Sequence, residues 1–339
     1  MRPSASKRWM LGCLVALLAL LMAVSACGDS DDDSGSSGGS GAASSGGTTT
    51  IRIANVPASL TAVPAQVAIQ EGFFEEQGLE VTADTPTLPF NQLPNTLGKQ
   101  YDLITSSAPN VINARENGLD LVLESFLERD SAEEPGAALI VPADSPIKTI
   151  NDLDGKSVGA PSVAGSNWTT LMCWAKNEGF DPQAIRGVEA PTPQIPDLLK
   201  NGRFDAALLF QPGYGQLLRD GYRDVGNSYE NCFGERIMTS AYVGLGSWVS
   251  ENKDALEGFH AALRDAVAWI DSHPDEAREL WLETSGLPKE VAEVSPPRPG
   301  GFEINDGREQ MLETAQKWLD VMRDVGVYDG DVQASDLVP

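Results

Sequence analysis

Residues 154–175 read DGKSVGAPSVAGSNWTTLMCWA, and this stretch organises our interpretation of the chain. Ser157–Ala160 is short, apolar and bounded by glycine, which is typical of a buried strand. Ser166 or Asn167 can cap the helix that follows. The backbone N–H groups at this helix start then face a loop of small residues, which suits a ligand with an acceptor-rich end. An ordinary strand-to-helix turn can have the same residues, so the rest of the chain has to distinguish a ligand-binding loop from such a turn.

The amino terminus has the features of a secretion signal. Three basic residues precede an apolar run over residues 9–24, and small residues then lead to Cys27. This pattern resembles a bacterial lipoprotein signal peptide over residues 1–26, with Cys27 acylated, as by palmitate, and anchored in the extracytoplasmic face of the cell membrane. A permanent transmembrane helix needs about 20 apolar residues, so the run is too short for one.

Residues 27–50 consist mainly of small and acidic residues and predict a flexible tether, because they cannot bury a core. We expect the folded part to begin near Ile51. Removing residues 1–26 removes three basic residues and no acidic ones, which takes the formal charge from −25 to −28. So negative a chain is not expected to bind nucleic acid.

Two cysteines, Cys173 and Cys232, remain after the signal region and Cys27 are set aside. In an oxidising compartment they can form one disulfide, which would tie the segment that leaves the second unit to its first helix. Two separate buried thiols are the alternative.

The folded part alternates between short apolar strands and periodic helices. The expected strands cover residues 51–56, 79–83, 102–105, 119–126, 137–141, 157–160, 185–189, 206–210 and 237–245. The expected helices cover residues 63–74, 90–98, 109–117, 166–179, 195–201, 214–220, 255–270, 274–284 and 308–325. This alternation predicts two α/β units with parallel sheets and helices on both faces. Trp269, Trp281 and Trp318 lie in apolar helical stripes and are expected to be packing residues.

Four short motifs carry a resemblance to a known family. They are GFFEEQGLEV at residues 72–81, the turn at residues 98–103, DLDGKSVG at residues 152–159, and GRFDAA at residues 202–207. With the lipoprotein signal, they resemble the solute-binding lipoproteins of ABC importers, in the branch that binds sulfonates, taurine, nitrate and thiamine pyrimidine precursors. The resemblance covers nearly all of residues 51–325.

The resemblance implies an α/β, two-lobed fold of the type II periplasmic-binding-protein (Venus flytrap) class, with two hinge strands and a ligand between the lobes. Lobe 1 would comprise residues 51–138 and 246–339, and lobe 2, with the hinge crossings, residues 139–245. The strands at residues 137–141 and 237–245 fit the crossings. The implied partners are a small organic ligand, an ABC permease and an ATPase, and we expect a monomer.

Ligands of such sheets bind at the carboxyl ends of strands. The candidate side chains at those ends are Ser59, Thr61, Ser106, Ser107, Asn110, Ser162, Gly165, Ser166, Asn167, Trp168, Gln194, Phe210, Gln211 and Tyr214. Trp168 either stacks on the ligand or packs within its lobe.

The candidate loops contain no Arg or Lys, and a buried anion without a cation is costly. A neutral or singly charged organic nutrient, sulfonate-like or pyrimidine-like, is therefore expected ahead of sulfate or nitrate. Arg129, after the fourth strand, would overturn this argument if it reached the cleft.

Enzymes of the same fold make the thiamine pyrimidine and need a pocket histidine and lysine. The histidines here are His260 and His273, both in carboxyl-terminal helices away from the candidate loops. The sequence has no Gly-x-Ser-x-Gly elbow, phosphate-binding loop or metal-spaced His/Cys cluster. We expect a binding protein without catalytic residues, metal or cofactor. A pyrimidine-synthesis-type enzyme and a non-transport surface lipoprotein are the alternatives.

Overall fold

The structure is a computed structural model that describes residues 48–56, 59–86, 90–130 and 137–339. The described residues belong to one compact unit, and none of their helices combines the length and apolar character needed to cross a membrane. The expected signal peptide, Cys27 and most of the expected tether lie outside the described residues. The tether prediction extends too far, because Thr49 and Thr50 already belong to the first strand.

The first sheet has six strands in the order β11-β4-β10-β3-β1-β2. They are β1 (Thr49–Ala54), β2 (Leu79–Asp84), β3 (Leu103–Ser106), β4 (Leu121–Asp130), β10 (Ile237–Leu245) and β11 (Phe302–Asn305). Strand β1 pairs in parallel with β2 and β3, whereas β10 is antiparallel to both β3 and β4, and β11 is antiparallel to β4. The expectation of a purely parallel sheet is therefore wrong.

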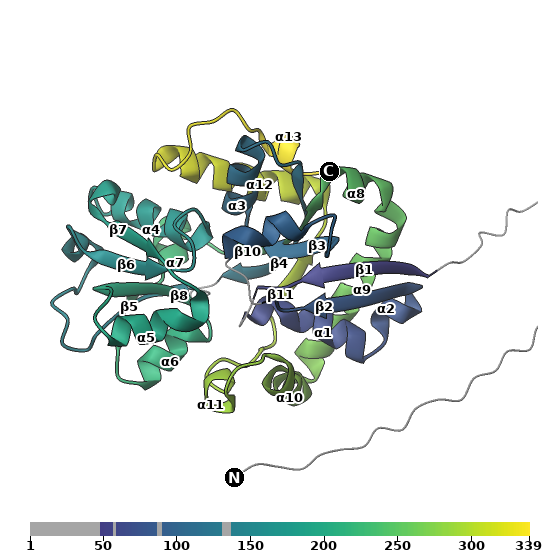
Figure 1. Ribbon diagram of the computed structural model, residues 1–339, viewed down its shortest axis with the longest axis horizontal. Coiled ribbons are helices and arrows are strands. Elements are labelled where there is room, and N and C mark those ends of the chain that lie inside the picture. The colour runs from purple at the N-terminus through teal and green to yellow at the C-terminus, as the bar shows by residue number, and fades with distance from the viewer. Residues whose placement is uncertain (1–47, 57–58, 87–89, 131–136) are drawn as a thin grey trace, which may run out of the picture. The chain divides into compact units, whose positions relative to one another are not determined.

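Helices cover both faces of this sheet, as Figure 1 shows. One face carries α1 (Val63–Gln70), α2 (Phe73–Glu76), α9 (Lys253–Ser272) and α10 (Pro274–Thr284). The other carries α3 (Ala108–Glu116), α12 (Arg308–Asp324) and α13 (Ala334–Leu337). The single helix expected over residues 63–74 is broken, because Gly72 has a φ of 78°, a left-handed conformation that glycine adopts readily.

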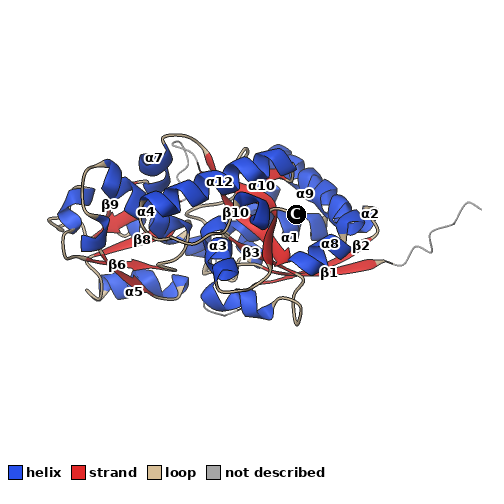
Figure 2. Ribbon diagram, turned by 90° about the horizontal axis from the view of Figure 1, so that it is seen from above, coloured by secondary structure: helices blue, strands red, loops and turns tan. Residues whose placement is uncertain are grey.

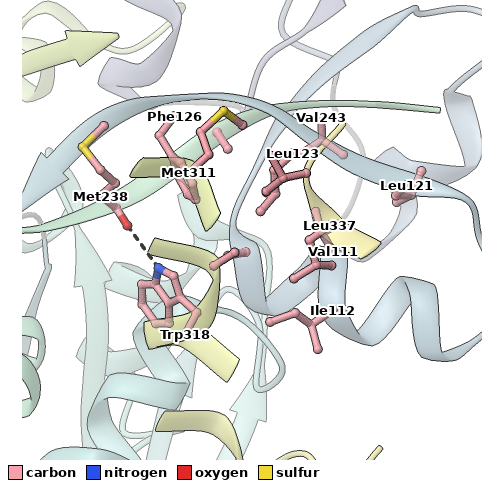
Figure 3. Packing of buried hydrophobic residues seen from close by; sticks show 14 of the residues in the cluster. Val111, Ile112, Leu121, Leu123, Phe126, Met238, Val243, Met311, Trp318 and Leu337 are labelled. Carbon is pink, nitrogen blue, oxygen red and sulfur yellow. Dashed lines mark hydrogen bonds between the residues drawn. The ribbon is translucent and has the colours of Figure 1, made fainter. Parts of the chain in front are cut away.

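The expected packing tryptophans lie in these cores. Trp281 and Trp318 are buried, and Trp269 packs against the cluster on the α9 face. In the close-up of Figure 3, the Trp318 indole donates a 3.2 Å hydrogen bond to the carbonyl of Met238 on β10. The bond satisfies the one polar atom of a side chain that otherwise supplies apolar area.

The second sheet has five strands in the order β7-β6-β8-β5-β9. They are β5 (Ala137–Val141), β6 (Ser157–Ala160), β7 (Arg186–Glu189), β8 (Ala206–Phe210) and β9 (Arg223–Gly226). Strand β6 is parallel to β7 and β8, and β5 is antiparallel to β8 and β9. This sheet also departs from the expected parallel arrangement.

The central strands of the second sheet are apolar because both of their faces are buried. In β5, Leu139 and Val141 pack on one side, while Ala138 and Ile140 pack on the other. Figure 2 shows the strands between helices of the two sides. These helices are α4 (Ser166–Asn177) and α7 (Ser228–Phe233) on one side, and α5 (Ile195–Lys200) and α6 (Gly213–Arg219) on the other.

The remaining elements are short. They are the 3-10 helices η1 (Leu60–Ala62), η2 (Phe90–Thr96), η3 (Ile150–Leu153), η4 (Pro182–Ala184) and η5 (Thr192–Gln194), and the helices α8 (Gly246–Glu251) and α11 (Lys289–Ala292). The helix expected over residues 90–98 is thus a 3-10 helix.

The two sheets are connected by the chain and by packing. Strand β5 lies wholly in the second sheet and β10 wholly in the first, so the chain changes sheets between β4 and β5 and returns between β9 and β10. The end of α12 also packs on α4, where the Lys176 ammonium lies 2.5 Å from the Asp324 carboxylate. The lobe boundaries given above remain a prediction.

Cys173 and Cys232, the pair expected from the sequence, form a disulfide with a Cα–Cα distance of 5.2 Å. It joins α4 to α7, the last helix before the chain returns to the first sheet. The bridge closes a loop with a sequence separation of 59 residues, and the corresponding loss of disorder in the unfolded chain stabilises the fold by about 4 kcal/mol.

Candidate functional site

A cavity of about 750 Å³ is lined by residues of both sheets. The first sheet contributes the segments after β1 and β3, the end of β4, the start of β10 and the residues that lead into β11. The second sheet contributes the loop between β6 and α4 and the segment after β8. Its volume lies within the roughly 300–1,000 Å³ range of small-molecule sites.

Most of the candidate side chains identified in the sequence line this cavity. They are Ser59, Thr61, Ser106, Ser107, Asn110, Ser162, Gly165, Ser166, Asn167, Phe210, Gln211 and Tyr214. They come from four segments that are distant in sequence and that the two sheets bring together. Their role in binding remains a prediction.

Trp168 and Gln194 lie elsewhere. Trp168 is buried in the core between α4 and the second sheet, so its alternative role as a packing residue describes it better than stacking on a ligand. The Trp168 ring packs against Gly187, which has no side chain. A Cβ atom at that position would lie 2.8 Å from the ring. Gln194 is exposed at the end of η5 and does not line the cavity.

The start of α4 is held by side chains rather than capped by them. Gly165 occupies the N-cap position without a side-chain bond, so the expected capping by Ser166 or Asn167 is wrong. The Tyr229 hydroxyl instead lies 2.8 Å from Ser166 Oγ and 2.6 Å from Asn167 Oδ1. Asn113 on α3 also donates a 3.1 Å hydrogen bond to the carbonyl of Ala164. These contacts fix the loop before α4 against neighbouring helices.

Hydroxyl and amide groups on the first sheet are also fixed by local hydrogen bonds. The Thr61 amide and hydroxyl both donate to Ser59 Oγ, over 3.3 Å and 3.1 Å. The Asn110 side chain donates a 3.1 Å bond to Ser107 Oγ. Such bonds leave spare donor or acceptor capacity on each group, because a hydroxyl has two lone pairs and an amide nitrogen has two hydrogens.

Glu128 is a cavity residue that the sequence interpretation missed. It lies near the end of β4, opposite Ser240 of β10 and Phe302 of β11. Its Oε2 atom accepts hydrogen bonds from Ser240 Oγ at 2.9 Å and Thr239 Oγ1 at 3.2 Å. Burial raises the pKa of Glu128, and the two hydroxyl hydrogen bonds oppose this rise without cancelling it.

Antiparallel pairing explains why Thr239 and Ser240 were missed, whereas Glu128 lies near the carboxyl end of β4, beyond the strand expected over residues 119–126. In a parallel sheet only carboxyl ends of strands meet at one edge, but an antiparallel strand brings its amino end to the same edge. Thr239 and Ser240 lie near the start of β10, and β10 is antiparallel to β4. The available signal was Glu128 itself, which directly follows the largely apolar run at residues 121–127, because a carboxylate near a strand end requires a partner.

Two cations also line the cavity, so the argument that it has none is wrong. Arg236 precedes β10 and Arg298 precedes β11, outside the five loops that were considered. Both residues are exposed, which places their charge in contact with water. The side chain of Arg129, named above as a possible exception, lies outside the described side chains.

Neither histidine lines the cavity. His260 on α9 is buried, with its Nε2 atom 2.5 Å from Glu124 Oε1 and its Nδ1 atom 3.1 Å from Asp306 Oδ2. His273 is exposed and stacks on Trp269. Within the described ranges, no group of three or more His, Cys, Asp or Glu residues is arranged to hold a metal ion.

Comparisons with known proteins agree with this architecture. The family model described as "NMT1/THI5 like" matches residues 61–277. The formylaminopyrimidine-binding protein of Halalkalibacterium halodurans is 27% identical over 225 residues, which cover 64% of this chain and 64% of that protein. A putative thiamine biosynthesis protein of Haemophilus influenzae is 27% identical over 221 residues, with 64% and 67% covered. The chain therefore matches about two thirds of the length of these relatives.

Solved structures show the fold. The alkanesulfonate-binding protein SsuA from Xanthomonas axonopodis pv. citri, bound to MOPS, is 17% identical with a TM-score of 0.71, covering 86% of this chain and 98% of that one. The aliphatic sulphonate binding protein SsuA from Escherichia coli is 18% identical with a TM-score of 0.68, covering 86% and 97%. The expected periplasmic-binding-protein-like α/β fold is confirmed.

Proposed function

Because the chain belongs to the NMT1/THI5-like family, we propose that it is the extracytoplasmic solute-binding component of an ABC importer. It captures a small organic nutrient, sulfonate-like or pyrimidine-like, in the cavity between the two sheets. It then delivers the nutrient to a permease that works with an ATPase. The protein acts as a monomer, held at the membrane by a lipid on Cys27.

The cavity is the observation that carries this proposal. Its lining mixes hydroxyl and amide groups with the aromatic side chains Phe210, Tyr214 and Tyr229. This mixture orients a small organic molecule by a few hydrogen bonds and covers its apolar surface. One relative is named as a formylaminopyrimidine-binding protein, and a protein of similar fold is named as a sulphonate binding protein. Both names support a ligand of this size.

The enzyme alternative lacks the groups that it requires. The described residues that line the cavity include no histidine, lysine or cysteine, so a histidine base or a thiolate nucleophile does not face a ligand there. The carboxyl group of Glu128 does line the cavity, but its presence is accounted for by ligand binding without catalysis. We therefore propose a non-catalytic role.

Calorimetry and thermal unfolding with sulfonates, aminopyrimidines, sulfate and nitrate test the proposal. A true ligand at 100 times its Kd should stabilise the fold by about 2.7 kcal/mol. Replacing Phe210 by alanine should weaken the binding of this ligand roughly tenfold, because a buried aromatic contact contributes on the order of 1–2 kcal/mol. Val188→Ala, at an exposed position on β7, is the matched control. Turnover of a bound pyrimidine, or no stabilisation by any small molecule, would contradict the proposal.

The anchor has a separate test. Cys27→Ala should release the protein from the membrane or stop its processing, since acylation needs the thiol. Unchanged membrane retention of the alanine variant would rule out this anchor while leaving the binding function intact.

A further inference from the structure

We propose that Glu128 selects the ligand by accepting a hydrogen bond from an N–H group, either a protonated amine or the amidine-like edge of a nitrogen heterocycle. The proposal rests on the proposed small-molecule binding and adds to it the residue that reads the ligand's charge. It gives the cavity a preference that neither the hydroxyl groups nor the aromatic groups provide. Hydroxyls accept and donate, and so they do not discriminate donors from acceptors.

The geometry leaves half of this carboxyl without a partner. Oε2 accepts from Ser240 and Thr239, whereas Oε1 has no hydrogen bond or ion pair with any described residue. An ionised carboxylate offers about four lone-pair sites and no donor. Glu128 lines the cavity and is partly accessible, so a ligand in the cavity is the natural partner for Oε1.

The side chains that the structure describes also supply no counter-ion for Glu128. No lysine, arginine or histidine of the described chain lies within ion-pairing distance of it, and two neutral hydroxyls offset only part of the cost of burying a charge. Burial accordingly raises its pKa. A ligand N–H donor supplies what is missing: a positive charge pairs with the carboxylate, and an amidine-like edge forms two parallel hydrogen bonds with the carboxyl when the pair shares one proton, carried by either the carboxyl or the ring nitrogen.

The same group disfavours an anion at this position. A sulfonate or sulfate placed against an ionised Glu128 would meet a like charge, which is strongly unfavourable. The arginine that precedes β10, Arg236, lies at an exposed position of the lining, where an anionic end of a ligand meets a hydrated cation. The cavity lining thus offers an acceptor at Glu128 and a donor at Arg236.

The rest of the lining fits a ligand that spans both sheets. Glu128 belongs to the first sheet, whereas Phe210 ends β8 of the second sheet and Tyr214 follows in α6. A molecule whose N–H group contacts Glu128 and whose apolar body contacts these rings holds the two sheets around it.

Two pairs of probes test this inference by calorimetry. The first pair is 4-amino-2-methylpyrimidine and its 4-oxo counterpart, and the second is 2-aminoethanesulfonate and ethanesulfonate. In each pair the members differ mainly in one amino group. We expect the wild-type protein to bind at least one amino compound tenfold or more tightly than its partner. We expect Glu128→Gln to reduce that preference to about twofold, because glutamine has a similar shape but no charge.

Two further variants complete the experiment. Glu128→Asp should keep the preference with weaker binding, because the carboxylate is retained and shortened. Glu303→Gln, which removes an exposed carboxylate on β11 outside the cavity lining, should match the wild type. Thermal unfolding of every variant establishes that it is folded.

The outcomes separate the two proposals. A preference that survives in Glu128→Gln, or a wild type that binds only the compounds without an amino group, overturns the role of Glu128 and leaves the binding function standing. If no probe binds the folded wild-type protein, both the ligand classes of the proposed function and the role of Glu128 fail.

Discussion

Glu124 and Glu128 lie on the same strand, β4, and meet opposite kinds of partner. Glu124 is almost fully buried against His260, whose other ring nitrogen contacts Asp306. Glu128 lines the cavity and, among the described side chains, has the hydroxyls of Ser240 and Thr239 as its partners. The first carboxylate has its counter-ion inside the protein. For the second, the proposed partner is an N–H group of the ligand.

The difference teaches how to separate structural from functional charges in this fold. A carboxylate that is paired in the native state contributes to stability, and its loss strands a partner. A carboxylate without a cation costs stability, and a protein retains it where function requires it. The variants below test whether these two positions behave in these two ways, beginning with the largest expected effect.

Neutralising each carboxylate gives the sharpest contrast. Glu124→Gln should lower the free energy of unfolding by about 3–5 kcal/mol, because it removes the buried anion of His260 and leaves only the partly exposed Asp306 beside the ring. Glu128→Gln should change it by less than about 1 kcal/mol, since glutamine still accepts from both hydroxyls. Urea unfolding at neutral pH measures both. Equal losses in the two variants would contradict the comparison.

The pH dependence of the free energy of unfolding should reveal the contribution of His260. Burial lowers the pKa of His260, but the hydrogen bond and charge of Glu124 and the charge of Asp306 outweigh it, and the pKa is raised above 6.5. Because the folded state holds the proton more tightly, this contribution is complete below about pH 6.5 and is lost as pH rises through the folded-state pKa.

The measurement compares unfolding free energies of the wild type and His260→Gln between pH 5.5 and pH 9. The wild-type advantage should shrink as pH rises, by about 1.4 kcal/mol for each unit by which the pKa is raised. Arg264, which also faces His260 and lowers its pKa, is unchanged in both proteins. An advantage that grows with pH would show that the histidine is neutral in the folded state.

Removing a hydroxyl beside Glu128 should change the free energy of unfolding by a smaller amount, on the order of 1 kcal/mol. The Ser240 hydroxyl bond is the larger of the two that lower the pKa of Glu128. In Ser240→Ala the carboxyl should therefore titrate at higher pH than in the wild type, as read by isotope-edited infrared spectroscopy. Thr239→Val should shift it in the same direction and by less. No shift in either variant would mean that water, not these hydroxyls, solvates the carboxylate.

The smallest effect is expected at the outer edge of the Glu124 cluster. Arg264 lies 2.7 Å from Asp306, and its side chain is about half exposed, at 49%. Exposed ion pairs contribute about 0.2–1 kcal/mol, so Arg264→Gln should cost no more than that and should lose its effect in 1 M salt. A loss as large as that of Glu124→Gln would show that the arginine, not the buried pair, holds the cluster together.

The sequence alone predicted much of the architecture, for reasons that can be traced to particular residues. Ala137–Val141 is apolar at every position, and only a strand buried on both faces has that composition. The alternation of such strands with periodic helices predicted two α/β units, and small hydroxyl residues at or just after strand ends, such as Ser106 and Ser162, line the cavity. These features depend on local patterns that side-chain periodicity records directly.

Only the tertiary structure decided which strands run antiparallel, and the cavity depends on that. Thr239 and Glu128 are far apart in the chain, and no local pattern indicates that β10 lies beside β4 with its amino end at the carboxyl end of β4. The same holds for Arg236, and for Trp168, whose helix is apolar around most of its circumference. Strand direction and helix rotation follow from the packing of distant segments, because each local sequence permits more than one arrangement and only the shared core selects among them.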